Sequence, residues 1–499
     1  MTSTLNDDFY GAAGDEASHD GTPPHVDVID GGSDDALPYP PPSNPTAVAR
    51  CILTELFTEL LPNGKEIYTL RYWRGDWYTW QRTHWQLTPD DELTGKVWLH
   101  LDGKKCRKGD ETQDWCPTGS KVADVRRALI YLVHLPDDAD APMWVDNTED
   151  AGLMAKDIIG MDNHLLHLPT RQVYGFTPRL FNLYALPYAY DAKAECPMWL
   201  RFIESTFADD RAGALAVQEF FGYVLTGDKS RQKGFMLIGP PGGGKGVLSN
   251  TLTAMIGEGN VASTDPKTLS GEFGLMPLIG KPLALLSDAR TDGPVGADVL
   301  GRLLRIIGND PIDVNRKSRP FWTGFLPTRL VWISNDLPRF VDPSGAIIRR
   351  WLVVRLTKAV DEKDRDANLG EKLRAELPGI LNWALQGLDA LSANGRFTEP
   401  GTQAETLDEL KDAASPVSAF LNDCYQVTGD MADIVPVTDV LTEFKVWAEK
   451  NGYRQRNRET LMGEIKSCPE KVTAKNTCPP GYPKKDRLVF GIRAGVKPW

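Results

Sequence analysis

Apolar and polar residues alternate with two different periods along this chain, and the change of period marks its parts. Residues 71–87, RYWRGDWYTWQRTHWQL, alternate aromatic and polar positions, which predicts a short β-meander with a turn at Gly75 and Asp76. Apolar residues recur every three or four positions in VADVRRALIYLV (122–133) and ALAVQEFFGYVLTG (214–227). This second period predicts two amphipathic helices.

Short β-branched segments alternate with helical ones between about residues 235 and 356. The apolar segments are FMLIG, PLALLS, RLVWIS and WLVVRL. Their alternation with helices predicts a mostly parallel α/β sheet covered by helices. Towards the C-terminus, TDVLTEFKVWAEKNG and RETLMGEIKS predict two helices, and KVTAK and RLVFGI predict strands around a Pro/Gly turn. Two helices followed by a β-wing resemble a winged helix.

The composition is that of an ordinary globular protein, with 499 residues, 41% apolar and 25% charged, which suggests roughly three domains. The seven cysteines are odd in number and form no close C-x-x-C pair, as expected for reduced thiols in a cytoplasm. Cys106 and Cys116, like Cys468 and Cys478, leave a zinc site open, although zinc ligands usually stand closer together. No leader or membrane-spanning run of apolar residues is found, so we expect a cytoplasmic protein without a membrane partner.

The net charge of −12 is unevenly distributed. Residues 1–45 contain nine Asp or Glu, no Lys or Arg, and the run PYPPPSNP, so we expect a disordered acidic tail. Residues 443–499 contain thirteen Lys or Arg against six Asp or Glu, a local charge of +7. The basic end is therefore expected to face a polyanion.

The segment MLIGPPGGGKGVL places an apolar strand directly before a glycine loop and a lysine. Gly239, Gly244 and Lys245 have the spacing G-x-x-x-x-G-K, in which backbone N–H groups wrap a triphosphate and the lysine reaches its terminal phosphates. Gly246 stands where a Ser or Thr hydroxyl would bind Mg²⁺. The loop therefore predicts a nucleotide site but no standard metal site.

Polar residues at the ends of later apolar segments are candidates for the chemistry. Asp288 ends PLALLSD, where a carboxylate holds Mg²⁺ or orients water, and Asp292 is a candidate second acid. Asn335 ends RLVWISN, where an amide can hold the attacking water. Arg349 and Arg350 precede a strand and suit an arginine finger. Each has an ordinary alternative, such as a helix cap, a turn or a solvated strand edge.

The order GPPGGGKG, FGLMPLIGKPLALLSDAR, GNDPIDVNRKSRPFWTGFLPTRLVWISNDLPRF and GAIIRRW resembles the superfamily III AAA+ helicases. The resemblance is to the phage and plasmid primase-helicase family, which is related to the poxvirus primase-helicase. It implies an AAA+ P-loop NTPase core in residues 196–400 and an N-terminal α+β domain in residues 46–195. It also implies a C-terminal winged-helix-like DNA-binding domain in residues 415–499.

The resemblance also implies roles for individual residues. ATP would be bound by Gly239, Pro240, Pro241, Gly242, Gly243, Gly244, Lys245, Gly246 and Val247. Asp288 would serve Mg²⁺ and water, Asn335 would sense the γ-phosphate, and Arg350 would be the finger, with Arg349 as second choice. Arg316, Lys317 and Arg319 would lie on a hairpin near single-stranded DNA. Members of the family often have glycine after the lysine, so a group such as Ser287 would complete the metal site.

The function implied is an ATP-dependent DNA helicase of phage or mobile-element replication. The enzyme would form a homo-oligomeric ring, expected to be hexameric, that acts on single-stranded and forked DNA. No paired-acid polymerase site is found, so a separately encoded primase or polymerase is expected.

Two other functions were weighed against the helicase. A nucleotide kinase fits G-x-P-G-x-G-K-G, but such enzymes begin with the loop, whereas here the loop begins only at Gly239. An ATP-gated protein that binds or loads at replication origins without processive unwinding remains open. Strand displacement on a forked duplex separates it from a helicase.

Overall fold

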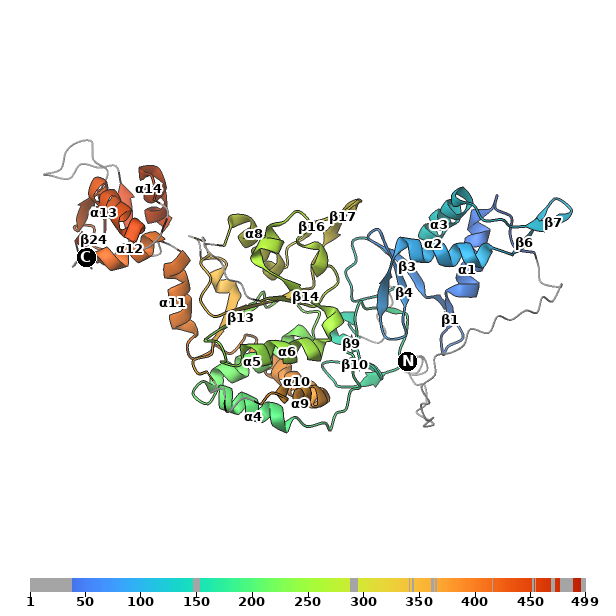
Figure 1. Ribbon diagram of the computed structural model, residues 1–499, viewed down its shortest axis with the longest axis horizontal. Coiled ribbons are helices and arrows are strands. Elements are labelled where there is room, and N and C mark those ends of the chain that lie inside the picture. The colour runs from blue at the N-terminus through green and yellow to red at the C-terminus, as the bar shows by residue number, and fades with distance from the viewer. Residues whose placement is uncertain are drawn as a thin grey trace, which may run out of the picture. The chain divides into compact units, whose positions relative to one another are not determined.

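The computed structural model describes the chain in segments. They are residues 38–146, 153–287, 295–340, 342, 345–359, 363, 366–414, 416–450, 453, 455–467, 472–475 and 488–494. The chain divides into two compact units (Figure 1). The first comprises Met1–Lys193, Leu225–Asp228 and Asp313–Gly324, and the second comprises Ala194–Val224, Lys229–Ile312 and Phe325–Trp499. None of the helices in the described segments is long and apolar enough to span a bilayer.

Three helices and an antiparallel meander form the main core of the first unit. The helices are α1 (Pro45–Leu56), α2 (Asp90–Leu101) and α3 (Gly119–Val133). Their apolar faces meet in one buried cluster, which includes Ile52, Val97 and Leu129. The helix predicted over residues 122–133 is therefore present as part of α3, because its three- and four-residue spacing gives it one apolar face.

The aromatic meander is present as predicted. Its strands are β3 (Leu70–Trp73), β4 (Asp76–Trp80) and β5 (Trp85–Thr88), all antiparallel. Arg74 and Gly75 form the two-residue turn between β3 and β4, with φ of 50° and 82°. Two positive φ values are typical of a tight hairpin turn whose twist matches that of its strands.

The remaining elements of the first unit are short. They are β1 (Thr58–Leu60), β2 (Glu66–Tyr68), β6 (Lys105–Lys108), β7 (Glu111–Asp114), β8 (Met143–Trp144), η1 (Ala155–Asp157), β9 (Ile158–Gly160), β10 (Leu165–His167), β11 (Val173–Tyr174) and β12 (Leu180–Phe181). A further hairpin is formed by β16 (Ile312–Arg316) and β17 (Arg319–Gly324). Although this hairpin comes from the middle of the sequence, residues 313–324 pack with the first unit.

A five-stranded parallel sheet is the centre of the second unit. Its order is β14 (Val261–Thr264), β15 (Leu283–Leu286), β18 (Arg329–Ser334), β13 (Gly234–Ile238) and β19 (Trp351–Arg355). The four apolar segments of the sequence form β13, β15, β18 and β19, so the predicted parallel α/β sheet is confirmed. The strand β14, with the polar sequence VAST, was not predicted.

Helices cover both faces of this sheet, as Figure 1 shows with α5, α6 and α10 on one side and α8 on the other. The helical elements are α4 (Pro197–Thr206), α5 (Arg211–Val224), α6 (Lys245–Ile256), η2 (Glu258–Asn260), α7 (Pro266–Ser270), η3 (Met276–Leu278), α8 (Ala297–Gly308), η4 (Ile348–Arg350), α9 (Leu369–Ala375), α10 (Leu377–Asn394) and α11 (Gln403–Ala414). The helix predicted over residues 214–227 is α5, which ends three residues earlier than its glycine.

The C-terminal part of the second unit has its own apolar core, in which Phe420, Phe444, Trp447 and Ile465 are buried. Its elements are α12 (Pro416–Cys424), β20 (Tyr425–Val427), β21 (Ile434–Pro436), α13 (Val437–Lys450), α14 (Arg458–Ser467), β22 (Thr473–Lys475), β23 (Leu488–Phe490) and β24 (Ile492–Ala494). The two predicted helices are α13 and α14, and the two predicted strands are β22 and β23.

Candidate functional site

The predicted phosphate loop lies between a buried strand and a helix. Strand β13 ends at Ile238, the loop follows over residues 239–244, and α6 begins at Lys245. Gly242 and Gly244 have φ of 80° and 96°, a left-handed backbone that favours glycine. The N–H groups at the start of a helix have no partner within the helix, and together with the helix dipole they attract anions. The loop and the first turn of α6 therefore suit a phosphate group.

Gly239 brings the loop close to the neighbouring strand. A Cβ atom at this position would overlap the carbonyl oxygen of Leu356, which directly follows β19. The φ of Gly239 is 156°, at the limit of the region that side chains tolerate poorly. The loop can lie this close to the sheet only because residue 239 has no side chain.

Lys245 folds back over the loop that precedes it. Its Nζ donates hydrogen bonds to the carbonyl oxygens of Gly239 (2.5 Å) and Pro240 (2.9 Å). The side chain is buried, and burial lowers the pKa of its ammonium group. Both partners are neutral carbonyls, and a buried charge is costly unless an opposite charge balances it. A phosphate in the loop would supply that charge.

The first turn of α6 carries no hydroxyl at the usual metal position. A Cβ atom at Gly246 would meet no atom of the described residues within 4 Å, and Val247 follows it half-buried. The hydroxyl of Ser249 donates to the carbonyl of Gly246 at 3.2 Å. A protein ligand for Mg²⁺ would therefore come from another element.

No group of three or more His, Cys, Asp or Glu suited to a metal ion occurs among the described residues. Cys106 and Cys116 are both free thiols. Cys468 and Cys478, the other pair considered for zinc, lie outside the described part of the chain, so the zinc site remains a prediction without a test.

Asn335 lies beside the loop at the carboxyl edge of the sheet. Strand β18 pairs with β13 so that Ser334 is opposite Ile238, and the next residue, Asn335, is therefore level with Gly239. Its side chain is exposed. Ser287 directly follows β15, the other neighbour of β18. Ligands of open α/β sheets bind at this carboxyl edge. Asn335 and Ser287 lie at this edge, and their roles remain predictions from the sequence.

Asp288 and Asp292, the predicted metal and water ligands, lie outside the described residues. Their position relative to the loop remains a prediction from the sequence.

Arg349 and Arg350 lie at the opposite edge of the sheet. They form the end of η4, immediately before β19, and the first residue of β19, Trp351, pairs with Gly234 at the start of β13. Four residues of β13 separate this level from Ile238, which is about 13 Å at 3.3 Å per residue. The structure thus brings Asn335 to the loop and holds both arginines at the amino edge.

A direct hydrogen bond holds the side chain of Arg350 at the amino edge of the sheet. Its Nη1 donates to the side-chain carbonyl of Gln232 at 2.5 Å. Arg349 is exposed, and its backbone carbonyl accepts a hydrogen bond from Nζ of Lys233 at 2.6 Å. Burial lowers the pKa of Lys233, and the charge of Arg350 lowers it further, while Glu399 opposes the shift.

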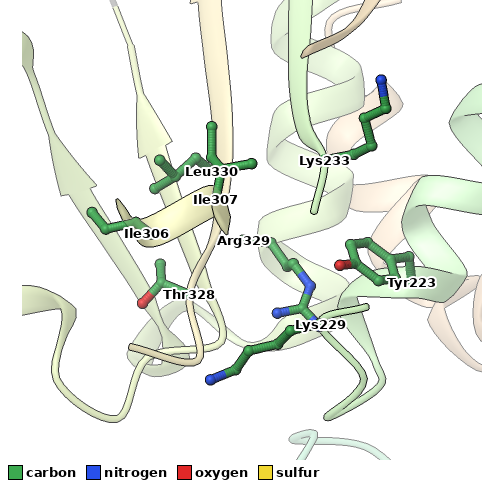
Figure 2. A pocket seen from close by; sticks show the side chains of 8 residues that line it. All are labelled: Tyr223, Lys229, Lys233, Ile306, Ile307, Thr328, Arg329 and Leu330. Atoms are coloured by element: carbon green, nitrogen blue, oxygen red, sulfur yellow. The ribbon is translucent and has the colours of Figure 1, made fainter. Parts of the chain in front are cut away.

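A small basic pocket opens at the same edge (Figure 2). Its lining consists of Tyr223, Lys229, Lys233, Ile306, Ile307, Thr328, Arg329 and Leu330. The guanidinium carbon of Arg329 lies 4.2 Å from the centre of the Tyr223 ring, close enough for a cation–π contact. Sequence reasoning did not single out these cations, although the signal was present as basic residues at the starts of β13 and β18.

Other residues beside the loop also escaped sequence reasoning. A Cβ atom at Gly244 would lie 3.3 Å from Cζ of Phe202 in α4, and one at Gly243 would lie 3.2 Å from the carbonyl oxygen of Lys358. Lys358 in turn forms an ion pair with Asp209. Nothing in the sequence distinguishes Phe202 from the other apolar residues of an amphipathic helix.

The three cations predicted to contact DNA share the hairpin β16–β17 but differ in environment. Lys317 is exposed at the turn, where Ser318 has a φ of 58°. Arg316 is only 4% exposed and pairs with Asp76, which also pairs with the partly exposed Arg319. The structure therefore offers Lys317 to solvent and buries Arg316.

Comparison with known proteins adds two findings. Residues 237–350 match a family of unknown function, DUF5906. Solved structures similar to the chain include three apo structures of the NrS-1 C-terminal region, each 12% identical with a TM-score of 0.48. They cover 85%, 91% and 90% of this chain, and the chain covers 96%, 100% and 99% of theirs. The matched family has no assigned function, so the role of the chain is inferred from its own geometry.

Proposed function

We propose that this chain is an ATP-dependent DNA helicase of phage or mobile-element replication. It hydrolyses ATP at the subunit interfaces of a ring, expected to be hexameric, and uses the energy to move along single-stranded DNA and unwind duplex. The observation that carries the proposal is the buried ammonium of Lys245, which lies inside a glycine loop and, among the described residues, has carbonyl oxygens as its hydrogen-bond partners. A triphosphate is the ligand for which such a loop is suited.

The residues around the loop have different roles in ATP hydrolysis. The backbone N–H groups of the loop and the ammonium of Lys245 bind the β- and γ-phosphates. Asn335, level with the loop, orients the attacking water. Asp288, with help from Ser287, would hold Mg²⁺, which when bound neutralises charge on the β- and γ-phosphate oxygens.

The position of Arg350 favours a ring. An arginine finger must contact the γ-phosphate, yet about 13 Å of strand separates Arg350 from the level of its own loop. A neighbouring subunit whose loop faces this edge would bring its ATP to Arg350. Gln232 holds the guanidinium at the edge from which it would act.

Contacts to DNA are proposed for two parts of the chain. The hairpin β16–β17, which carries Arg316, Lys317 and Arg319, contacts the single strand through its exposed side chains, because cations beside an exposed aromatic ring, here Phe321, are typical of strand-binding surfaces. The C-terminal domain, residues 415–499, contains the whole basic segment 443–499 with local charge +7 and is proposed to bind duplex. A separately encoded primase or polymerase would supply primers.

A mixing experiment tests the shared active site. Lys245→Ala should abolish ATP hydrolysis, and Arg350→Ala should reduce the rate by about 10³- to 10⁵-fold, as for other fingers supplied by a neighbour. Each variant lacks a different half of the site. In rings assembled from equal amounts, about one quarter of the interfaces would join an intact Lys245 to an intact Arg350. ATP turnover should therefore return in part.

The matched control is the double variant Lys245→Ala/Arg350→Ala, which restores no interface with either single variant. Mixtures that exchange subunits and bind ATP, yet show only their summed residual rates, would contradict the finger and the ring together. Strand displacement on a forked duplex by the parent protein then decides between a helicase and an origin-loading protein.

A further inference from the structure

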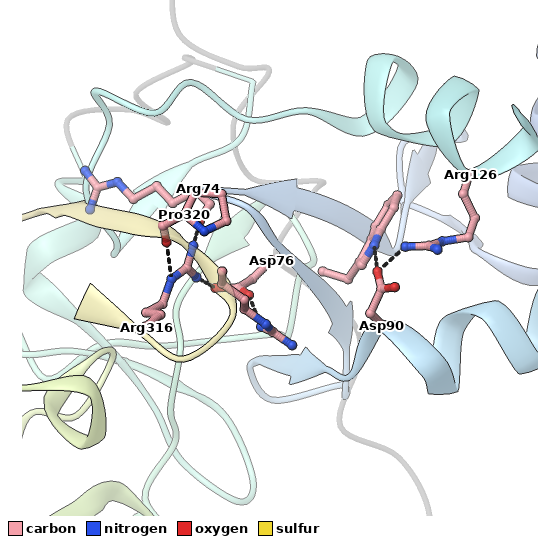
Figure 3. A network of polar contacts seen from close by, with 8 residues as sticks. Arg74, Asp76, Asp90, Arg126, Arg316 and Pro320 are labelled. Atoms are coloured by element: carbon pink, nitrogen blue, oxygen red, sulfur yellow. Dashed lines mark hydrogen bonds and ion pairs between the residues drawn. The ribbon is translucent and has the colours of Figure 1, made fainter. Parts of the chain in front are cut away.

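The hairpin β16–β17 is attached to the first unit by one shared carboxylate (Figure 3). Asp76 stands at the start of β4, next to the turn formed by Arg74 and Gly75. Its Oδ2 accepts a hydrogen bond from Arg316 Nη1, and its Oδ1 accepts one from Arg319 Nη1, both at 2.5 Å. Asp76 is 6% exposed and Arg316 is 4% exposed. This is a buried contact between residues 240 positions apart.

All three nitrogens of the Arg316 guanidinium take part in this attachment. Besides the bond to Asp76, its Nε donates to the carbonyl of Pro320 at 3.0 Å, and its Nη2 donates to the carbonyl of Arg74 at 3.3 Å. A Cβ atom at Gly75 would lie 3.0 Å from Nη2 of Arg316, so the turn glycine makes room for the guanidinium. Each nitrogen of Arg316 donates to an acceptor within the protein, so the guanidinium is held inside the fold.

A second contact fixes the other strand of the hairpin. The guanidinium of Arg74 lies 4.5 Å from the Trp73 ring and 5.0 Å from the Trp322 ring. Its Nη2 donates to Asp140 at 2.8 Å. Trp322 on β17 is therefore buried against the meander and cannot stack on a base.

Three further side chains of the hairpin are exposed. Lys317 is exposed at the turn, the side chain of Arg319 is 42% exposed, and Phe321 is 65% exposed. Arg319 and Phe321 are two positions apart on β17, so they lie on the same face of the strand. An exposed ring beside cations is suited to a base and its phosphates.

We infer that Asp76 is a positioning residue for single-stranded nucleic acid. Its carboxylate fastens Arg316 and aims Arg319, so that the first unit holds Lys317, Arg319 and Phe321 as one strand-binding surface. Arg316 is then the structural anchor of this surface, not one of its phosphate ligands. The inference rests on the proposed function, because it assumes that the hairpin contacts the strand.

Equilibrium binding of a fluorescent oligothymidine to the full-length chain tests the surface itself. Phe321→Ala should weaken binding about tenfold, within the range for losing one stacked base. Lys317→Ala should lower the slope of log affinity against log salt by about 0.7, as for one phosphate contact to a single strand. Lys108→Ala, which removes an exposed cation from β6, is the control and should bind like the parent.

Asp76→Asn tests the positioning role. It keeps the shape of the side chain but removes its charge. Binding should weaken about tenfold, as expected when one contact between the surface and the strand is lost. In the variant Lys317→Ala/Phe321→Ala, adding Asp76→Asn should weaken binding further by less than about threefold. The effects of residues that act through one another are not additive. Arg319→Lys, which keeps a cation for Asp76, should preserve most of the affinity, whereas Arg319→Gln should not.

Three outcomes would overturn the inference. Tighter binding by Asp76→Asn would show that the carboxylate blocks the strand. Equal losses by Asp76→Asn with and without the hairpin residues would show that Asp76 acts elsewhere. Parent-like affinity of Phe321→Ala and Lys317→Ala would remove the surface. If Asp76→Asn does not fold, the pair Arg319→Gln and Arg319→Lys decides, and failure of the parent chain to bind the oligonucleotide sinks the proposed function instead.

Discussion

At the scale of single residues, Gly239 at the start of the phosphate loop and Gly246 in the first turn of α6 have opposite environments. Gly239 lies against the carbonyl of Leu356, whereas a Cβ atom at Gly246 would contact none of the described residues. Gly239→Ala should therefore push the loop away from β19 and weaken ATP binding severely. Gly246→Ala is the matched control, and its slightly better helix propensity should leave stability equal or higher by up to about 1 kcal/mol.

Titration with a fluorescent ATP analogue, together with thermal unfolding, measures both changes. Equal binding by the two variants would show that the close approach at Gly239 is not needed for the nucleotide. If Gly246→Ala lost ATP binding and Gly239→Ala kept it, the phosphate would lie nearer to the first turn of α6 than the loop geometry indicates.

The positions of candidate site residues were predictable where one short segment contains the signal. The spacing of Gly239, Gly244 and Lys245 is local, and so is the position of Asn335 at the end of an apolar run. The pairing of Arg316 with Asp76 was not predictable, because the two residues are 240 positions apart and each is an ordinary charged residue in its own segment. Sequence alone therefore treats Arg316, Lys317 and Arg319 as equivalent cations.

At the scale of elements, β19 is an edge strand that another helix protects. The side-chain carbonyl of Gln403, in α11, accepts a hydrogen bond from the backbone N–H of Val353 at 2.8 Å. Gln403 is buried. Unpaired edges are prone to pair with other chains. This contact gives the N–H group of Val353 a partner and makes that part of the edge less available to another chain.

Gln403→Ala should destabilise the second unit by about 1–3 kcal/mol, because it leaves a buried N–H group without a partner. Glu405→Ala, at an exposed position of the same helix, controls for helix propensity. Urea unfolding measures both. A Gln403→Ala chain as stable as the control would mean that water reaches Val353.

The elements themselves differed in how well the sequence revealed them. Four strands of the parallel sheet consist of apolar runs, and each was found. Strand β14 was missed because its sequence, VAST, is short and half polar, and only pairing with β15 makes it a strand. Likewise, the edge at which Arg350 lies follows from the register of β13 and β19, which no local pattern encodes.

At the scale of the whole molecule, the first unit contains three histidines whose pKa is lowered by burial. They are His84, His100 and His167. Lys104 adds to the shift at His100 and Arg171 to that at His167, while Glu55 and Asp157 oppose them. The unfolded chain, with an ordinary histidine pKa of about 6.5, then binds more protons than the folded one as the solution is acidified.

The first unit should therefore be most stable above about pH 6.5 and lose stability as the pH falls through the lowered pKa values. The urea midpoint at pH 7.5 and at pH 5.5 measures this dependence. In a His84→Gln/His167→Gln variant the difference between the two midpoints should shrink. A midpoint that rises on acidification, or a variant with an unchanged difference, would contradict the assignment.

The packing of hairpin β16–β17 with the first unit also limits where the gene can recombine. The chain passes between the two units five times, after Lys193, Val224, Asp228, Ile312 and Gly324. A recombination joint near residue 193 would pair a foreign meander with this hairpin, and Arg316 and Trp322 would then face side chains other than Asp76 and Arg74. Gene exchange should therefore transmit residues 38–324 as one block. Chimaeras joined inside this block should fold poorly unless Arg74, Asp76, Arg316 and Trp322 all come from the same parent.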